Sequence, residues 1–260
     1  GPLFKWQAAK PVELDEHIAA RITELRASSQ PYDYVAAELQ ALESKFSWGR
    51  GIGIANTVLS GFAAASYVGY SMNEQVLLID RRDAFSNIVG KWRDEQRVGS
   101  SGRVPNVTTV ASTDIASKVI EVASAGETAT IFAPGEQVDE LLPGLIQLSD
   151  AQVNCTVFVS TNASSAMTEI VELTKSDCPL LWAASPQECH DMAIIATALS
   201  AVVRVPVIVC FDATHSGHSV ADVGVGTPAW LQRFVDTAAY GGSMEMEGST
   251  TSSSVSDNYK

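Results

Sequence analysis

The sequence predicts an α/β fold of three layers, in which helices cover both faces of a mostly parallel sheet. Short apolar runs alternate with helical runs along most of the chain, and the apolar runs lack an alternation of polar and apolar residues. Strands that are apolar throughout are typical of a parallel sheet buried on both faces. The chain has 260 residues, and a hydrophobic content of 46% with a charged content of 18% indicates a folded domain rather than a disordered chain.

The first part of the chain, residues 1–50, is expected to form a helical extension. Apolar residues recur at helical spacing over residues 13–28 and again over residues 32–46, with Pro31 between the two runs. Helices this short cannot bury their apolar stripes alone, so we expect them to dock on the main domain or on a partner.

A glycine-rich stretch, residues 48–56, follows this extension. Three glycines alternate there, which is similar to the start of the GxGxxG pattern of dinucleotide-binding loops. The last glycine of that pattern would fall on Asn56, so we interpret the stretch as a hinge into the domain. Asn56 is then expected to cap a helix over residues 57–70.

Strands and helices are expected to alternate from there to residue 240. The strands are predicted at residues 76–79, 107–110, 128–133, 156–160, 180–183 and 205–211. The helices are predicted at residues 83–95, 113–124, 136–148, 166–174, 186–203 and 227–240. Ser185, Pro186 and Glu188 supply an N-cap, a first-turn proline and a favourable charge to one helix start, and either Ser112 or Thr113 is expected to cap another.

Residues 51–240 are therefore assigned to one α/β domain. Residues 241–260 lack apolar periodicity and are rich in glycine and serine, which predicts a disordered tail or a linker. The longest apolar run, residues 192–203, is too short to span a membrane.

Charge and cysteine content limit the classes of partner. The net charge of −13 and the pI of about 4.6 argue against binding to nucleic acid or to an anionic membrane surface, and no basic cluster offsets them. The four cysteines have no CxxC spacing. We therefore expect buried free thiols in a reducing compartment, and a cytoplasmic protein.

The polar loop after the strand at residues 205–211 is where chemistry is expected first, because ligands in α/β proteins bind beyond the carboxyl ends of strands. Its candidate side chains are Asp212, His215, Ser216 and His218. The two loop histidines could bind a metal together with His190 or Asp191, but a histidine pair in a loop of Gly and Ser is a weak metal pattern. A loop that is hydrogen-bonded within itself is favoured, and the absence of a GxSxG pattern disfavours a hydrolase.

Around this loop the chain resembles the first domain of pyruvate:ferredoxin oxidoreductases. The matching residues are Ser185, Gln187, Glu188, Asp191, Val205, Pro206, Phe211, Asp212, Ser216 and His218. A weaker similarity extends over residues 54–225. The resemblance implies a fold like that of thiamine-diphosphate-binding domains, and the half of such a site that holds the pyrimidine ring.

The same resemblance implies that the cofactor site is degenerate. The family needs a glutamate at the pyrimidine ring, an arginine at the 2-oxoacid and a proline-rich substrate loop. The matching positions carry Thr113, Asn162 and the sequence DRRDAFS at residues 80–86. We therefore expect no cofactor and no catalytic residue in this chain.

A similar loss is known from the N-terminal domain of fungal NADPH sulfite reductase flavoprotein alpha subunits, which this chain resembles most. The leading hypothesis is a non-catalytic structural or assembly domain that acts by self-association, as a homo-oligomer, or by docking to a protein partner. The alternative is a component of an active oxidoreductase, either an NADPH sulfite reductase alpha subunit or a 2-oxoacid:ferredoxin oxidoreductase.

Overall fold

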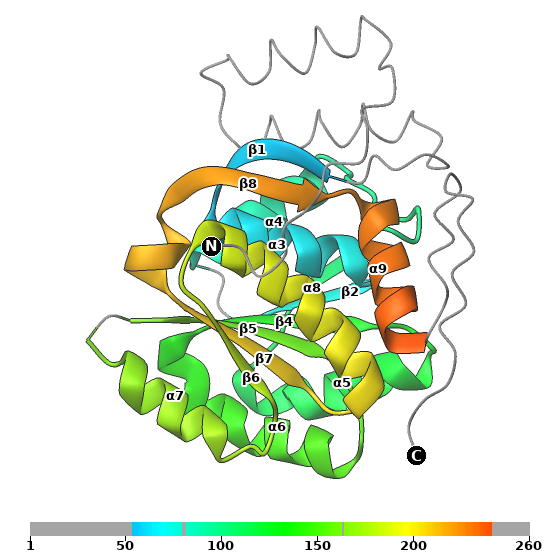
Figure 1. Cartoon of the computed structure of the whole chain (residues 1–260). Helices are drawn as coiled ribbons and strands as arrows, with labels where there is room; N and C mark the ends of the chain where they lie inside the picture. Colours follow the sequence, from blue (N-terminus) through cyan, green and yellow to red (C-terminus); the bar gives the residue numbers. More distant parts are fainter. Residues whose placement is uncertain (1–53, 80–81, 163, 241–260) are drawn as a thin grey trace, which may run out of the picture.

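The computed structural model describes residues 54–79, 82–162 and 164–240, which form one large and one small sheet (Figure 1). The large sheet has six parallel strands in the order β3-β2-β4-β5-β7-β6. These strands are β2 (Gln75–Leu78), β3 (Asn106–Thr109), β4 (Ala129–Pro134), β5 (Thr156–Thr161), β6 (Leu180–Ala183) and β7 (Val207–Asp212). The predicted α/β class with a mostly parallel sheet is thereby confirmed.

The helices of the described part connect these strands. They are α3 (Gly61–Met72), α4 (Ala84–Asp94), α5 (Ile115–Ser124), α6 (Val138–Asp150), α7 (Ala166–Thr174), α8 (Pro186–Val203) and α9 (Pro228–Tyr240). None of them is both long and apolar enough to cross a bilayer. The helices predicted at residues 13–28 and 32–46 and the tail predicted at residues 241–260 lie outside the described residues.

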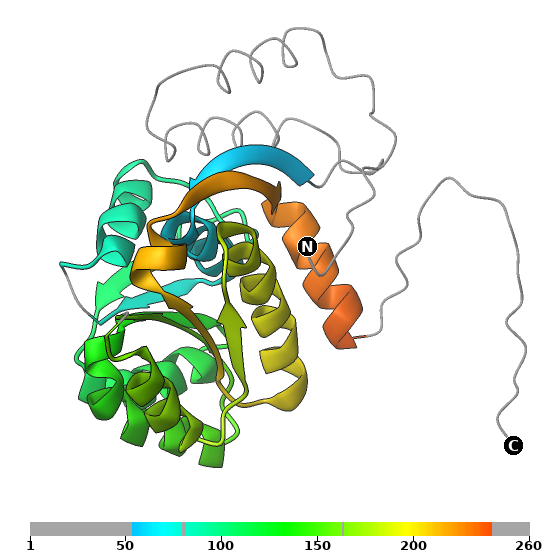
Figure 2. The ribbon, with the colours of Figure 1, turned by 60° about the vertical axis from the view of Figure 1, so that its left-hand side comes forward.

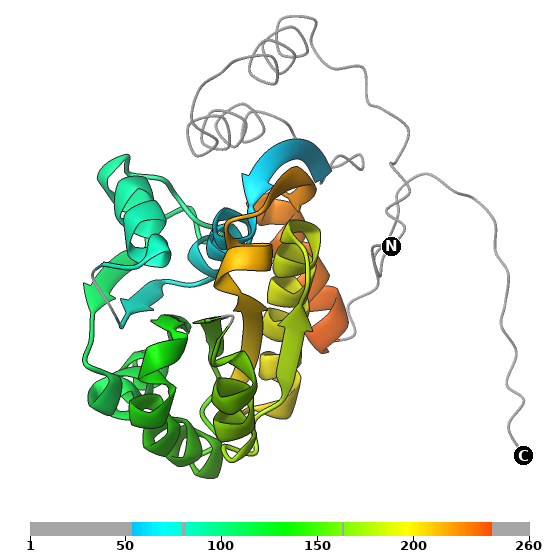
Figure 3. The ribbon, with the colours of Figure 1, turned by 90° about the vertical axis from the view of Figure 1, so that its left-hand side faces the viewer.

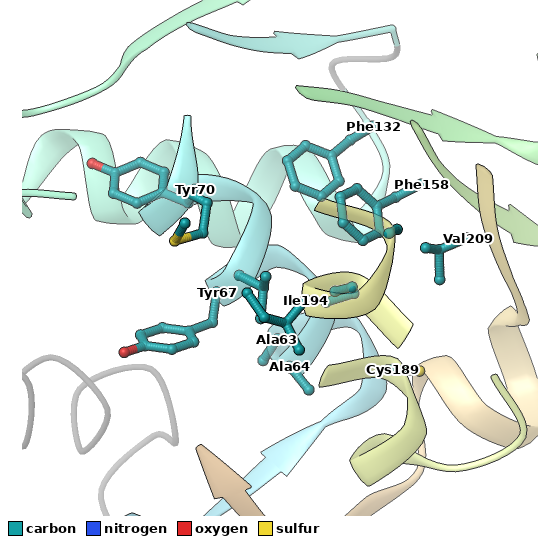
Figure 4. Packing of buried hydrophobic residues seen from close by; sticks show 14 of the residues in the cluster. Ala63, Ala64, Tyr67, Tyr70, Phe132, Phe158, Cys189, Ile194 and Val209 are labelled. Atoms are coloured by element: carbon teal, nitrogen blue, oxygen red, sulfur yellow. The ribbon is translucent and has the colours of Figure 1, made fainter. Parts of the chain in front are cut away.

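Neighbouring residues of the central strands point to opposite faces of the sheet, as the pleat of a strand requires. Phe132 and Phe158 stack with ring centroids 4.9 Å apart, in a hydrophobic core that they share with α3, α4, α8 and α9. Ile131 and Val157 face the other core, which α5, α6 and α7 cover. Figure 4 shows side chains of α3, α8 and the sheet meeting in the first core. The three predicted layers are thus present.

The small sheet is an antiparallel ribbon of β1 (Ile54–Ser60) and β8 (Val220–Gly226), which lies over α3 and α8 (Figure 2). The sequence pattern does not predict β8, because its glycines weaken the strand signal and its partner is far away in the chain. The predicted hinge over residues 48–56 is wrong for residues 54–56, which belong to β1. Its earlier residues lie outside the described ranges.

The predicted start of the first domain helix is also wrong. Residues 57–60 belong to a strand, and the helix begins at Gly61. Its cap is Ser60 rather than Asn56, and the Ser60 side chain accepts a hydrogen bond from the Ala63 N–H at 3.1 Å. For the other elements, predicted and observed bounds differ by at most two residues, and those of α7, β6 and α8 are identical.

The two edge strands depart from the expectation that all strands are buried on both faces. Every residue of β3 is exposed or half-buried, and Trp182 of β6 is 39% exposed. Among the described residues both strands have a neighbouring strand on one side only, so they are less completely covered than the central strands. Figure 3 shows β3 and β6 at opposite sides of the sheet.

Candidate functional site

The carboxyl ends of the parallel strands meet at one edge of the sheet, and the predicted site residues gather there. Thr113 follows β3, Asn162 follows β5, and Asp212 ends β7. The chain also changes face at this edge, because α4 after β2 packs in one core and α6 after β4 packs in the other. Such a change of direction is where α/β proteins bind ligands.

The loop after β7 is closed by its own hydrogen bonds; we call residues 212–219 the β7 turn. The Asp212 Oδ1 accepts hydrogen bonds from the Thr214 N–H at 2.8 Å and from the His215 N–H at 2.6 Å. The Ser219 hydroxyl donates to the His215 carbonyl at 2.5 Å. Asp212 is buried and caps a π-helical turn over Ala213–Gly217. The predicted hydrogen-bonded loop is thus confirmed.

The β7 turn also rests against the start of α3. A Cβ atom at Gly61 would lie 2.2 Å from the Ser216 carbonyl oxygen, so only glycine allows this approach. The His218 ring lies with its centroid 4.9 Å from that of Phe62. Ser216 is buried, whereas His215 and His218 are exposed. Packing against α3 thus fixes the shape of the turn.

The other two proposed metal ligands belong to the interior of the protein. The His190 Nδ1 lies 3.0 Å from the Asp191 Oδ1, and the His190 Nε2 accepts a hydrogen bond from the Gly226 N–H at 3.2 Å. Both side chains are buried, and His190 joins β8 to α8 while Asp191 is hydrogen-bonded to residues of its own helix. Across the described residues no group of three or more His, Cys, Asp or Glu side chains could hold a metal ion. The structure therefore gives the metal alternative no support.

A second cluster joins the ends of β4 and β5; we call it the β4–β5 end. It consists of Gly135, Glu136, Asn162, Ser165 and Glu169. The Asn162 amide nitrogen Nδ2 donates to the Glu136 Oε1 at 2.8 Å, and the Asn162 N–H donates to the Glu169 Oε2 at 3.2 Å. The Ser165 hydroxyl donates to the Glu169 Oε1 at 2.6 Å. Both oxygens of Glu169 are thereby used.

Glu169 is the residue that sequence reasoning missed at this edge. It is only 8% exposed, and a Cβ atom at Gly135 would lie 2.2 Å from its Oε2. The carboxylate therefore fills the space that Gly135 leaves open at the start of α6. A serine four residues before a glutamate was the only signal available, and that spacing also occurs on ordinary exposed helices.

Thr113 lies on a short 3-10 turn, Ser112–Asp114, and its side chain is exposed. The prediction that Ser112 or Thr113 caps the next helix is wrong, because α5 has no side-chain cap. The Ser112 hydroxyl instead donates to the Gln137 Oε1 at 2.7 Å and so links the ends of β3 and β4. The Ser112 hydroxyl thus bonds to a distant segment of the chain instead of capping the adjacent helix.

All four cysteines are free and buried, as the sequence predicts. Burial raises the pKa of each thiol above its ordinary value of 9.0. The thiolate is the nucleophilic form of cysteine, so these residues are poor nucleophiles at neutral pH.

Comparison with known proteins supports the resemblance to pyruvate:ferredoxin oxidoreductases that the sequence predicts. A family model described as "Pyruvate flavodoxin/ferredoxin oxidoreductase, thiamine diP-bdg" matches residues 151–251. Pyruvate-flavodoxin oxidoreductase of Nostoc sp. is 24% identical over 189 residues, which are 68% of this chain and 46% of that protein. Pyruvate:ferredoxin oxidoreductase of Moorella thermoacetica is 23% identical over 68% of this chain and 16% of that protein.

The same similarity extends to a solved structure. The 2-oxoglutarate:ferredoxin oxidoreductase from Magnetococcus marinus superposes with a TM-score of 0.50 over 82% of this chain and 40% of that one, at 13% identity. This chain thus spans less than half of the length of each of these proteins. The fold is accordingly that of the thiamine-diphosphate-binding-like domain of 2-oxoacid oxidoreductases, and the chain is similar in sequence to pyruvate:ferredoxin and pyruvate-flavodoxin oxidoreductases.

Proposed function

We propose that this chain is a non-catalytic domain that contributes to an assembly by self-association or by docking to a protein partner. The observation that carries the proposal is Thr113. By the resemblance to pyruvate:ferredoxin oxidoreductases it stands where a glutamate would contact the pyrimidine ring of thiamine diphosphate. A hydroxyl has neither a negative charge nor a proton that ionises near neutral pH, so it cannot replace that carboxylate.

The neighbouring residues fit the cofactor and its substrate no better. Asn162 stands where the resemblance implies an arginine for the 2-oxoacid, and its side chain is hydrogen-bonded to Glu136. The Glu136 and Glu169 carboxylates place negative charge close to that position, which disfavours an anionic substrate. No step of 2-oxoacid chemistry follows from these side chains.

Calorimetry with thiamine diphosphate and Mg²⁺ tests this proposal. We expect no binding by the full chain, and a Kd of about 10 µM or tighter would contradict the proposal. The variants Thr113→Glu and Asn162→Arg, alone and combined, restore the side chains that the resemblance implies. Binding by these variants, but not by the unchanged chain, would locate the loss at the two positions.

A second candidate function is that of a component of an active oxidoreductase, either an NADPH sulfite reductase alpha subunit or a 2-oxoacid:ferredoxin oxidoreductase. The names of the similar proteins, and the partial length over which they match, favour the 2-oxoacid:ferredoxin oxidoreductase. The sulfite reductase alternative rests on the resemblance in sequence alone. Flavodoxin-like and reductase domains encoded downstream would identify the sulfite reductase alternative. Cofactor binding that appears only after a partner chain is added would identify the other.

We further propose a cytoplasmic location. The four buried cysteines form no disulfide, which suits a compartment that keeps thiols reduced. Detection of the native protein in an oxidising compartment outside the cytoplasm would contradict this location.

A further inference from the structure

The outer side of β6 is an open sheet edge within the described part of the chain. β6 pairs with β7 only. Its residues, Leu180–Ala183, carry no charge and no proline, which are two devices that commonly protect edge strands from pairing with other chains. A tryptophan with 39% of its surface exposed, Trp182, stands on this strand.

The backbone of β6 has hydrogen-bonding groups free to accept another strand. The Ile208 N–H of β7 donates to the Pro179 carbonyl at 2.9 Å, so the peptide groups of Pro179 and Leu181 face β7. Because successive residues of a strand point their peptide groups to opposite sides, those of Leu180 and Trp182 face the open edge. A further strand could therefore be added without disturbing the existing ladder.

Exposed apolar side chains also occur on the two helices that precede and follow this strand in the chain. Five of the eight large hydrophobic residues exposed in the described part lie on α7, β6 and α8, which are consecutive in the chain. They are Met167, Val171, Trp182, Val202 and Val203. Figure 1 shows α7 and α8 on opposite faces of the sheet at this end. An exposed tryptophan on an open strand favours an interaction surface at this edge.

The opposite edge of the sheet does not share these properties. β3 has the sequence NVTT, and its Asn106 side chain donates to the Gln75 Oε1 at 2.9 Å. Asn106 and Thr109 are exposed, so this edge presents polar groups. An assembly that uses β6 but not β3 closes after two copies, instead of growing into a fibre.

We propose that two copies of this chain associate through antiparallel pairing of their β6 strands about a two-fold axis. The proposal rests on the proposed assembly function and names its partner and surface. A second copy is the favoured occupant because of charge. The chain carries a net charge of −13, but residues 178–187 carry none. Antiparallel pairing sets the four uncharged residues of β6 against each other, so the paired strands of two acidic molecules carry no opposing like charges.

Sedimentation velocity of the full chain at several concentrations tests this dimer. We expect a concentration-dependent dimer for the unchanged protein and a monomer for Trp182→Lys, which places a charge on each side of the symmetric contact. Thr109→Lys makes the same change in charge on the β3 edge and should leave the dimer intact. Trp182→Thr keeps a good strand former, so it separates loss of the contact from loss of the fold, and should weaken association by about tenfold.

The outcomes distinguish this interface from the proposed function. A dimer that persists in Trp182→Lys, with native circular dichroism, overturns the β6 interface but leaves an assembly function through another surface. A monomeric unchanged chain that binds no thiamine diphosphate also overturns the β6 dimer and leaves partner docking. A monomer that does bind thiamine diphosphate overturns both. If residues of the same chain cover β6, every variant will be a monomer, and this result also overturns the β6 dimer.

Discussion

The β4–β5 end and the β7 turn lie at the same edge of the sheet, but they are held in different ways. The β4–β5 end depends on side chains from separate elements, since Glu169 of α7 accepts hydrogen bonds and fills the space above Gly135. The β7 turn depends mainly on backbone, since Asp212 accepts from the next residues of its own turn and a carbonyl rests against Gly61.

This difference bears on how each place responds to substitution. At the β4–β5 end, single substitutions of side chains change the charge and the space available while the backbone stays the same. At the β7 turn, the backbone itself is fixed by its packing on α3, so the turn keeps its shape whatever exposed side chains it carries. The comparison predicts that stability depends on individual side chains at the β4–β5 end and on backbone packing at the β7 turn.

The largest effect is expected for Gly61→Ala. Its Cβ atom would lie 2.2 Å from the Ser216 carbonyl oxygen and 2.8 Å from the carbonyl carbon, and backbone atoms cannot move aside as a flexible side chain can. We expect the free energy of unfolding to fall by about 3 kcal/mol in urea titrations.

Gly90→Ala is the matched control: Gly90 lies within α4 with nothing within 4 Å of its Cβ position, so alanine should stabilise that helix by about 0.5–1 kcal/mol. Equal stability of both variants would remove the argument that the β7 turn is fixed by backbone packing.

The next effect concerns Glu169. Glu169→Ala leaves the Asn162 N–H and the Ser165 hydroxyl without this acceptor and should cost about 2 kcal/mol. Gly135→Ala should also destabilise the unchanged protein, because the three nearest atoms to its Cβ all belong to the Glu169 carboxylate. In the Glu169→Ala background that clash is absent.

A double-mutant cycle measures this dependence. The cost of Gly135→Ala should largely disappear when Glu169 is alanine, which gives a coupling free energy of about 1 kcal/mol or more. Strictly additive costs would show that the two residues do not compete for the same space, and the description of the β4–β5 end as held by side chains would fail.

These two places also show what the sequence could and could not predict. The start of α8 was predictable because its signals are local: the Ser185 side chain accepts from the Glu188 N–H, as the cap pattern implies. The polar β7 turn was predictable for the same reason. The contact of Glu169 with Gly135 was not, because it joins segments more than thirty residues apart and depends on how α7 packs beside α6.

The sequence did not predict the ribbon of β1 and β8, for a related reason. Its strands are separated by nearly the whole domain, and each one alone gives a weak pattern. The helix cap, Ser60, lies in a stretch whose sequence is equally compatible with the first turn of a helix. Pairing between distant segments, rather than local propensity, decided the structure there.

A smaller effect is expected for Asp212. Asp212→Ala removes the acceptor for two backbone N–H groups and should cost about 1–2 kcal/mol. Asp212→Asn keeps an acceptor oxygen and should cost no more than about 0.5 kcal/mol, because asparagine caps as well as aspartate. Thermal or urea unfolding measures both. A large loss in the asparagine variant would mean that the charge of Asp212, and not only its oxygen, holds the β7 turn.

The smallest effect is the contribution of each buried thiol to the loss of folding stability at alkaline pH. Burial raises the pKa of Cys189, beside the β7 turn, and burial followed by the Glu169 charge raises that of Cys210, beside the β4–β5 end. The unfolded chain loses these protons above the ordinary pKa of 9.0 while the folded chain keeps them, so ionisation favours unfolding and stability falls as pH rises. Each thiol should contribute about 0.3 kcal/mol to the loss between pH 8 and pH 9. In urea titrations at pH 8 and pH 9, Cys189→Ala and Cys210→Ala should each reduce the fall in the free energy of unfolding by that amount. A slope unchanged in Cys210→Ala alone would indicate that the β4–β5 end opens to solvent and lets its thiol ionise in the folded chain.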